Sequence, residues 1–139
     1  KYLMSLREDY CDLINDKKLI FGGKLKRSQI PEKSYMNDCF LHVFQGSMDK
    51  TLIEQTMLGI PVVTTNTEYL KEFGSWDPKS TSNFSLNDEL NAFLNCPSYS
   101  RSKILLERRE KAVKNHSLEA WIKKLSPILI SERKSTLIL

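Results

Sequence analysis

The chain has 139 residues, of which 40% are hydrophobic and 27% are charged, and its formal net charge is +4. This length and apolar content are enough for one compact domain with a core of its own. No apolar run reaches the roughly 18 residues that a membrane-spanning helix requires, and no signal-peptide pattern follows Lys1. The composition therefore predicts a globular chain without a membrane span.

The cysteines indicate the cellular compartment of the protein, and the basic residues indicate which classes of partner it could bind. Cys11, Cys39 and Cys96 make an odd number without metal-ligand spacing, which predicts free thiols and a cytoplasmic protein. Residues 101–124 contain eight Lys and Arg against three Glu, and a solvent-exposed helix face is the simplest interpretation. The alternative is attraction to a phosphate-bearing ligand or to an acidic membrane surface, as a peripheral association. Nucleic acid is not a predicted partner, because no aromatic residues alternate with the basic ones.

The first predicted elements are a helix, a strand and a second helix. Residues 2–15 keep their apolar side chains on one side, which predicts an amphipathic helix. Residues 18–22 predict a short apolar strand, followed by a glycine that allows a positive φ or the close approach of a ligand. Ile30 and Pro31 then begin the next helix, since proline is favoured in a first turn.

The central part of the sequence carries the pattern on which the functional prediction depends. Residues 39–44 are apolar apart from His42, and residues 61–65 are rich in β-branched side chains, so both segments predict buried strands. We interpret His42 as a core or strand-end residue rather than a catalytic group. Lys50–Leu58 has helical spacing and ends at Gly59. A strand, a helix and a strand in so short a segment predict a βαβ unit with parallel strands.

The turn before this central helix is suited to an anion. Ser47 or Asp49 can cap the helix, whose first N–H groups have no internal partner and whose dipole places roughly half a positive charge there. Such an end binds anions, most often phosphate. Glu54 lies one turn further in, and a carboxylate beside a phosphate site is suited to the hydroxyls of a ribose. Ligands of parallel sheets collect at the carboxyl ends of the strands, where this turn lies.

The rest of the chain is predicted to be largely helical. The predicted elements are helices over residues 67–73, 87–94, 100–115 and 117–128, a loop over residues 76–85 and a loose tail over residues 130–139. Thr67 is the expected cap of the first of these helices, and a brief strand near Phe84 is an alternative within the loop. The last helix carries a stripe that we expect to pack on the domain: Leu118, Trp121, Ile122 and Leu125.

The segment GSMDKTLIEQTMLGIPVVTTN, residues 46–66, resembles the donor-binding segment of retaining glycosyltransferases of the GT-B fold, in the group 1 or glycogen-synthase-like superfamily. Those enzymes typically read Leu-Leu-Glu-Ala-Met-Ala-x-Gly-x-Pro-Val at this place. The agreeing positions here are Glu54, Met57, Gly59, Pro61, Val62 and Val63. Many members have an acidic residue where this chain has Gly46, whereas Ser47-Met48-Asp49-Lys50 resembles the Ser-Leu-Asp-Lys of a subset.

The resemblance implies a fold and an activity. The fold would be α/β, a Rossmann-like parallel sheet with helices on both faces, over residues 1–129, and it would form one half of a GT-B enzyme. That enzyme would transfer a sugar, with retention, from a nucleoside-diphosphate sugar to an unknown acceptor, without a cofactor or an essential metal. The amino-terminal acceptor domain would be a missing partner. The donor domain itself would be shortened at its amino end, and the chain alone would be inactive.

The resemblance also implies donor-binding residues but no catalytic residue. The N–H groups of Asp49, Lys50 and Thr51 would face the diphosphate, Glu54 the ribose, Ser47 and Met48 the sugar, and Gly23, Lys24 and Leu25 the base. The alternative is a non-enzymatic α/β module that binds a nucleotide or a phosphate. A receiver-like or flavodoxin-like domain is less well supported, because the sequence has neither the acidic cluster nor the flavin loop that these require.

Overall fold

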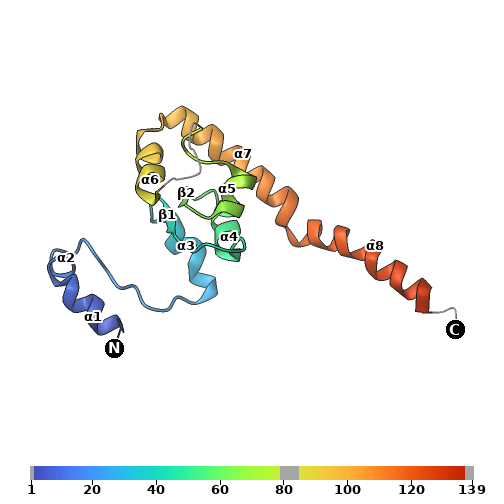
Figure 1. Ribbon diagram of the computed structural model, residues 1–139, viewed down its shortest axis with the longest axis horizontal. Coiled ribbons are helices and arrows are strands. Elements are labelled where there is room, and N and C mark those ends of the chain that lie inside the picture. The colour runs from blue at the N-terminus through green and yellow to red at the C-terminus, as the bar shows by residue number, and fades with distance from the viewer. Residues whose placement is uncertain (1, 79–84, 137–139) are drawn as a thin grey trace. The chain divides into compact units, whose positions relative to one another are not determined.

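The computed structural model describes residues 2–78 and 85–136, coloured in Figure 1. The chain divides into two compact units, Lys1–Ile30 and Pro31–Leu139, and each is described by itself. The described residues form a mixed α/β structure that is mostly helical, with a small parallel sheet in the carboxyl-terminal unit. No helix within these residues is long and apolar enough to cross a membrane.

The amino-terminal unit begins with α1 (Tyr2–Asp9) and α2 (Cys11–Asn15). The predicted single helix over residues 2–15 is interrupted at Tyr10, whose φ of −117° and ψ of 25° lie outside the helical region. The two helices keep the predicted amphipathic character, but every apolar residue in them remains at least partly exposed. This unit therefore has no buried core of its own within the described residues.

The predicted strand over residues 18–22 is wrong. The backbone N–H groups of Lys18 and Leu19 both bind the carbonyl oxygen of Leu13, at 2.8 and 3.0 Å, so they close the end of α2 instead of pairing with a strand. Lys17 has a φ of 57°, which turns the chain back at this point. The apolar side chains that follow line a hollow against the two helices, and the guanidinium of Arg7 lies 5.6 Å from the Phe21 ring centre. Contacts within this unit thus replace the expected sheet.

The carboxyl-terminal unit contains the predicted βαβ unit. After η1 (Arg27–Gln29) and α3 (Ile30–Tyr35), the chain forms β1 (Phe40–His42), α4 (Lys50–Leu58) and β2 (Val62–Thr64). The two strands are parallel, and their register pairs Phe40 with Val62 and His42 with Thr64. Gly59 ends α4 at a φ of 78°, a left-handed conformation that favours glycine. The predicted strand–helix–strand order and its parallel pairing are confirmed.

The core lies on both faces of β2. Val62 belongs to a cluster with Leu52 of α4 and Tyr69 of α5 (Thr67–Phe73), and the neighbouring Val63 belongs to a second cluster with Trp76 and Phe93. Alternate residues of a strand point to opposite faces, so the two clusters cover the two sides of β2. The described sheet has two strands, and a complete Rossmann-like sheet stays a prediction.

The remaining helices follow the predicted order with three corrections. They are α6 (Leu86–Asn95), α7 (Ser98–His116) and α8 (Leu118–Thr136), and the strand considered near Phe84 lies outside the described residues. Asn66, not Thr67, caps α5, because its side chain is held by the carbonyl of Phe44 and accepts the N–H of Tyr69 at 2.9 Å. The predicted loose tail is helical through Thr136, since residues 132–134 are Glu, Arg and Lys, which favour helix.

The third correction concerns the apolar stripe of α8, which does not pack on the unit. Leu118 is 73% exposed and Trp121 is 60% exposed. Among the described elements, α8 packs mainly against α7. Ile122 is also exposed, whereas Leu125 is half-buried, so the stripe has the predicted helical spacing without most of the predicted burial.

The basic residues of α7 bind the carboxyl ends of other helices. Arg101 donates through Nη2 to the carbonyls of Phe93, Leu94 and Cys96 at the end of α6, at 3.0 to 3.3 Å. Arg109 donates to the carbonyl of Met57 in the last turn of α4 at 3.1 Å. The last carbonyls of a helix lack internal partners, and cations are favoured beside them. The predicted solvent-exposed basic face is therefore wrong for Arg101, which is half-buried in this role, and for Arg108, which is buried.

Candidate functional site

A hollow of about 660 Å³ lies where β1 and β2 end. Its lining comes from the loop after β1 and from the first turn of α5: Gln45, Gly46, Ser47, Met48, Thr67 and Glu68. The two strands are parallel, so both sets of residues follow carboxyl ends at the same edge of the sheet. This is the edge at which ligands of parallel α/β sheets usually bind.

Polar side chains hold the loop after β1 against the end of β2. Gln45 donates through Nε2 to both the carbonyl and the hydroxyl of Thr65, each at 2.8 Å. The amide of Asn66 donates to the carbonyl of Phe44 at 3.0 Å. Gly46 has a φ of 134°, and an added Cβ would meet the Phe44 ring at 3.2 Å. The shape of the loop thus depends on a glycine and on two amide side chains.

The amino end of α4 is capped by Asp49. Its carboxylate accepts the N–H of Thr51 at 3.0 Å, and its carbonyl accepts the N–H of Leu52 at 3.1 Å. The bond from Thr51 holds the pKa of the Asp49 carboxyl below its ordinary value. His42, at the end of β1, places Nε2 3.6 Å from the other carboxylate oxygen of Asp49. Of the two predicted caps, Asp49 is the one used, and it already occupies one N–H group that was expected to face a phosphate.

The rest of the predicted donor site falls into two groups. Ser47, Met48, Lys50, Thr51 and Glu54 lie with Asp49 around the first turns of α4. The Glu54 side chain is 30% exposed, and its Oε1 lies 3.9 Å from the Lys50 ammonium. Met48 packs partly against the core, whereas Ser47, Lys50 and Thr51 are exposed.

The other group is Gly23, Lys24 and Leu25, which belong to the amino-terminal unit and are exposed there. Each unit is described by itself, so the base-side role of these three residues stays a prediction. Sequence reasoning did not single out Gln45, Asn66 or Glu68. Asn66 had a detectable signal, because it is a polar residue directly after a predicted parallel strand.

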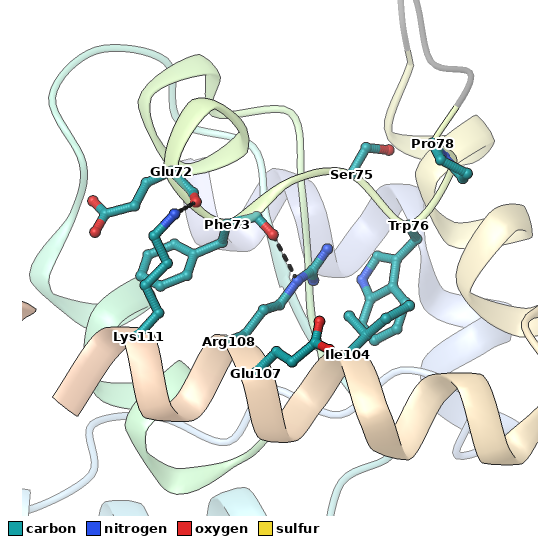
Figure 2. A pocket seen from close by; sticks show the side chains of 9 residues that line it. All are labelled: Glu72, Phe73, Ser75, Trp76, Pro78, Ile104, Glu107, Arg108 and Lys111. Atoms are coloured by element: carbon teal, nitrogen blue, oxygen red, sulfur yellow. Dashed lines mark hydrogen bonds between the residues drawn. The ribbon is translucent and has the colours of Figure 1, made fainter. Parts of the chain in front are cut away.

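A second hollow, of about 390 Å³, lies between α5 and α7 (Figure 2). Figure 2 shows the ammonium of Lys111 bound to the carbonyl of Glu72 and the Nε of Arg108 bound to the carbonyl of Phe73. The Nη2 of Arg108 also donates to the carbonyl of Gly74 at 2.6 Å. These carbonyls belong to the carboxyl end of α5, so the cations of this hollow cap a helix.

The charge of Arg108 is balanced inside the protein. Only 4% of Arg108 is exposed, its guanidinium lies 4.4 Å from the Trp76 ring centre, and burial lowers its pKa. Glu89 is fully buried and attracts Arg108, and burial raises the pKa of its carboxyl. The Glu89 carboxylate accepts the hydroxyl of Ser75 and the N–H of Trp76, at 2.6 and 3.0 Å. Because these groups tie elements together, the hollow at the strand ends is the better candidate functional site.

The chain was compared with protein-family models, with curated proteins and with solved structures, and nothing matches it. A proposal for its function therefore depends on the residues and geometry of the chain itself.

Proposed function

We propose that the chain is the donor-binding half of a retaining glycosyltransferase, which holds a nucleoside-diphosphate sugar for transfer to an acceptor. The single observation that carries the proposal is the unit of β1, α4 and β2. The capped helix α4, the left-handed Gly59 and β2 lie within residues 46–66, the segment that resembles the donor-binding motif, and β1 precedes this segment and pairs with β2 in parallel. This arrangement supports the proposal.

In this proposal the diphosphate lies at the amino end of α4, where the helix dipole favours an anion. The sugar occupies the hollow at the strand ends, beside Ser47 and Met48. Glu54, one turn along α4, accepts hydrogen bonds from the two ribose hydroxyls. Catalysis is largely electrostatic, through stabilisation of the charge on the departing diphosphate.

One observation favours a second candidate, a non-enzymatic module that binds a nucleotide or a phosphate weakly. The Asp49 carboxylate already accepts the N–H of Thr51 at 3.0 Å. A bound diphosphate has to displace this carboxylate or bind beside it, and two neighbouring anions repel. Because Asp49 caps the helix, the amino end of α4 contributes less binding free energy to a diphosphate than a helix end without such a carboxylate.

The test is a calorimetric titration of the chain with UDP and with GDP. Glu54→Gln keeps the size of the side chain and removes its charge. A hydrogen bond to a charged acceptor contributes roughly 1.5 to 3 kcal/mol, so the affinity should fall by about ten-fold or more.

Glu107→Gln is the matched control. Glu107 also pairs with a lysine four residues before it, at 4.0 Å, but it lies in α7 at the other hollow. Its replacement should leave the affinity unchanged. If wild type and Glu54→Gln bind equally, Glu54 has no part in the site. If the wild type binds nucleotides but transfers no sugar in the presence of an acceptor domain, the binding module is the better description.

A further inference from the structure

One side of α8 exposes apolar side chains along three helical turns (red in Figure 1). Leu118, Trp121, Ile122 and Leu129 are separated by three, four or seven residues, which places them on one face of the helix. Each of the four is more than half exposed, from 52% for Ile122 to 73% for Leu118. These four residues, called the α8 stripe below, form an exposed apolar face, and the predicted fourth member, Leu125, lies on the same face but is half-buried.

The side of α8 away from the stripe carries two exposed lysines, Lys123 and Lys124, together with Glu119. The Nζ of Lys124 donates to the carbonyl of Asn115 at 3.3 Å. A basic helix with an apolar face is typical of segments that lie in the surface of an anionic membrane.

Trp121 fits the same environment. Its ring lies at the border of the stripe and is 60% exposed. Tryptophan is enriched at the boundary between headgroups and acyl chains, because its ring is largely apolar while its N–H needs a polar partner. An exposed tryptophan between apolar and basic residues thus favours a lipid surface over plain solvent.

A second copy of the chain is a poorer partner for the stripe. A seam between two helices needs an apolar repeat sustained over three or four heptads. The whole of α8 has 19 residues, which is fewer than three heptads, and it contains Pro127. Proline removes a helical hydrogen bond and bends the helix, which disturbs a regular seam. A fluid lipid surface does not require such a register.

We propose that α8 binds the surface of an anionic membrane, with the α8 stripe among the lipid headgroups and Lys123 and Lys124 beside the lipid phosphates. The helix lies on the membrane and does not cross it. Binding has an apolar part and an electrostatic part, and the two can be changed separately by mutation.

The test mixes the full chain with vesicles and measures binding by co-sedimentation. The vesicles contain phosphatidylcholine alone or with about one third phosphatidylglycerol, which gives a negative surface potential. We expect binding to the anionic vesicles, weaker binding at high salt, and much weaker binding to the neutral ones. Tryptophan emission should shift to the blue on binding, and the shift reports Trp121, because Trp76 is already 96% buried (4% exposed).

Two variants separate the two parts of the interaction. Trp121→Ser with Ile122→Ser removes half of the stripe, and affinity for anionic vesicles should fall by about ten-fold or more. Lys123→Gln with Lys124→Gln should lower it by about 25-fold, since each charge near the surface contributes about five-fold. Leu106→Ser is the matched control, because Leu106 is 54% exposed on α7 and lies outside the stripe. It should bind as the wild type does.

Three results would overturn the proposal. The first is no binding to anionic vesicles, and the second is equal binding to neutral and anionic ones. The third is a dimer in sedimentation that Trp121→Ser with Ile122→Ser dissociates, since a second copy then covers the stripe. Circular dichroism of each variant checks that the helices are retained, and the lysine variant tests the proposal even if the serine variant loses structure.

Discussion

The helices α7 and α8 have 19 residues each and follow one another in the chain, yet they use their side chains in opposite ways. α7 is the more polar of the two, and it buries Arg108 and Ala112. α8 is the more apolar, and none of its residues 118–130 is buried. In these two helices, whether a side chain is buried therefore depends on the groups it contacts. The hydropathy of the helix does not predict its burial.

The basic side chains of α7 bind backbone carbonyls at the ends of other helices. Three of its arginines bind carbonyls at the carboxyl ends of α4, α5 and α6. A long cationic side chain can lie along an apolar surface and still satisfy such an oxygen. The exposed apolar side chains of α8 carry no cationic group that could form such hydrogen bonds, and they are not buried in this unit.

From this comparison, we expect the largest loss of stability when Arg108 is replaced. Arg108→Ala removes the cation that faces buried Glu89 and leaves the carbonyls of Phe73 and Gly74 without their donor. A buried acceptor left without a donor costs about 1 to 3 kcal/mol, so the loss of both hydrogen bonds should remove a large share of the stability of a small domain. Urea unfolding followed by circular dichroism measures the loss.

Arg109→Ala is the control for this prediction. Arg109 is exposed and makes one hydrogen bond, to the carbonyl of Met57. Its removal should lower the free energy of unfolding by less than about 1 kcal/mol. Equal losses in the two variants would mean that the burial of Arg108 adds nothing to its role as a cap.

A smaller, pH-dependent effect is expected where α7 ends. The Glu72 carboxylate of α5 binds His116 at 2.8 Å and Asn115 at 3.1 Å. Burial raises the pKa of Glu72, but hydrogen bonds from His116 and Asn115, with the charges of His116 and Lys111, outweigh it and hold the pKa below 4.5. The folded state therefore binds fewer protons than the unfolded state in this range, and the stabilisation is lost as pH falls through the folded pKa.

Glu72→Gln tests this dependence. The wild type should be more stable than the variant by about 1 kcal/mol near pH 5.5, and the difference should shrink near pH 3. Glu68→Gln, which removes an exposed pair with Lys71 on the same helix, should have almost no effect at either pH. A difference for Glu72→Gln that grows on acidification would contradict the sign of the shift.

The smallest effect is expected in α8. Trp121→Ser removes a large apolar side chain that is 60% exposed, so the free energy of unfolding should change by less than about 0.5 kcal/mol. Combined with Ile122→Ser, the same substitution is expected to weaken binding to anionic vesicles by about ten-fold or more. A loss of stability above 2 kcal/mol would show that the stripe is packed in solution, and the contrast between α7 and α8 would disappear.

The sequence by itself determined the elements that depend on local signals. The bounds of α4, its end at Gly59, and the parallel pairing of residues 39–44 with residues 61–65 were all predicted, because spacing, a left-handed glycine and a short crossover are local features. The order of the later helices was predictable for the same reason. The turn before Lys50–Leu58 was predicted as well, and its residues 45–48 line the hollow at the strand ends.

The tertiary structure decided whatever depends on partners from distant parts of the chain. Residues 18–22 have strand-like composition, but the N–H groups of Lys18 and Leu19 close the end of α2, and these five residues form no strand. Asn66 rather than Thr67 caps α5 because the loop after β1 supplies the carbonyl of Phe44, which fixes the Asn66 side chain. The same dependence on distant partners explains why Arg108 of α7 becomes buried while the α8 stripe stays exposed. A backbone oxygen 35 residues away from Arg108 is invisible in a local pattern, and it determines which side chains become buried.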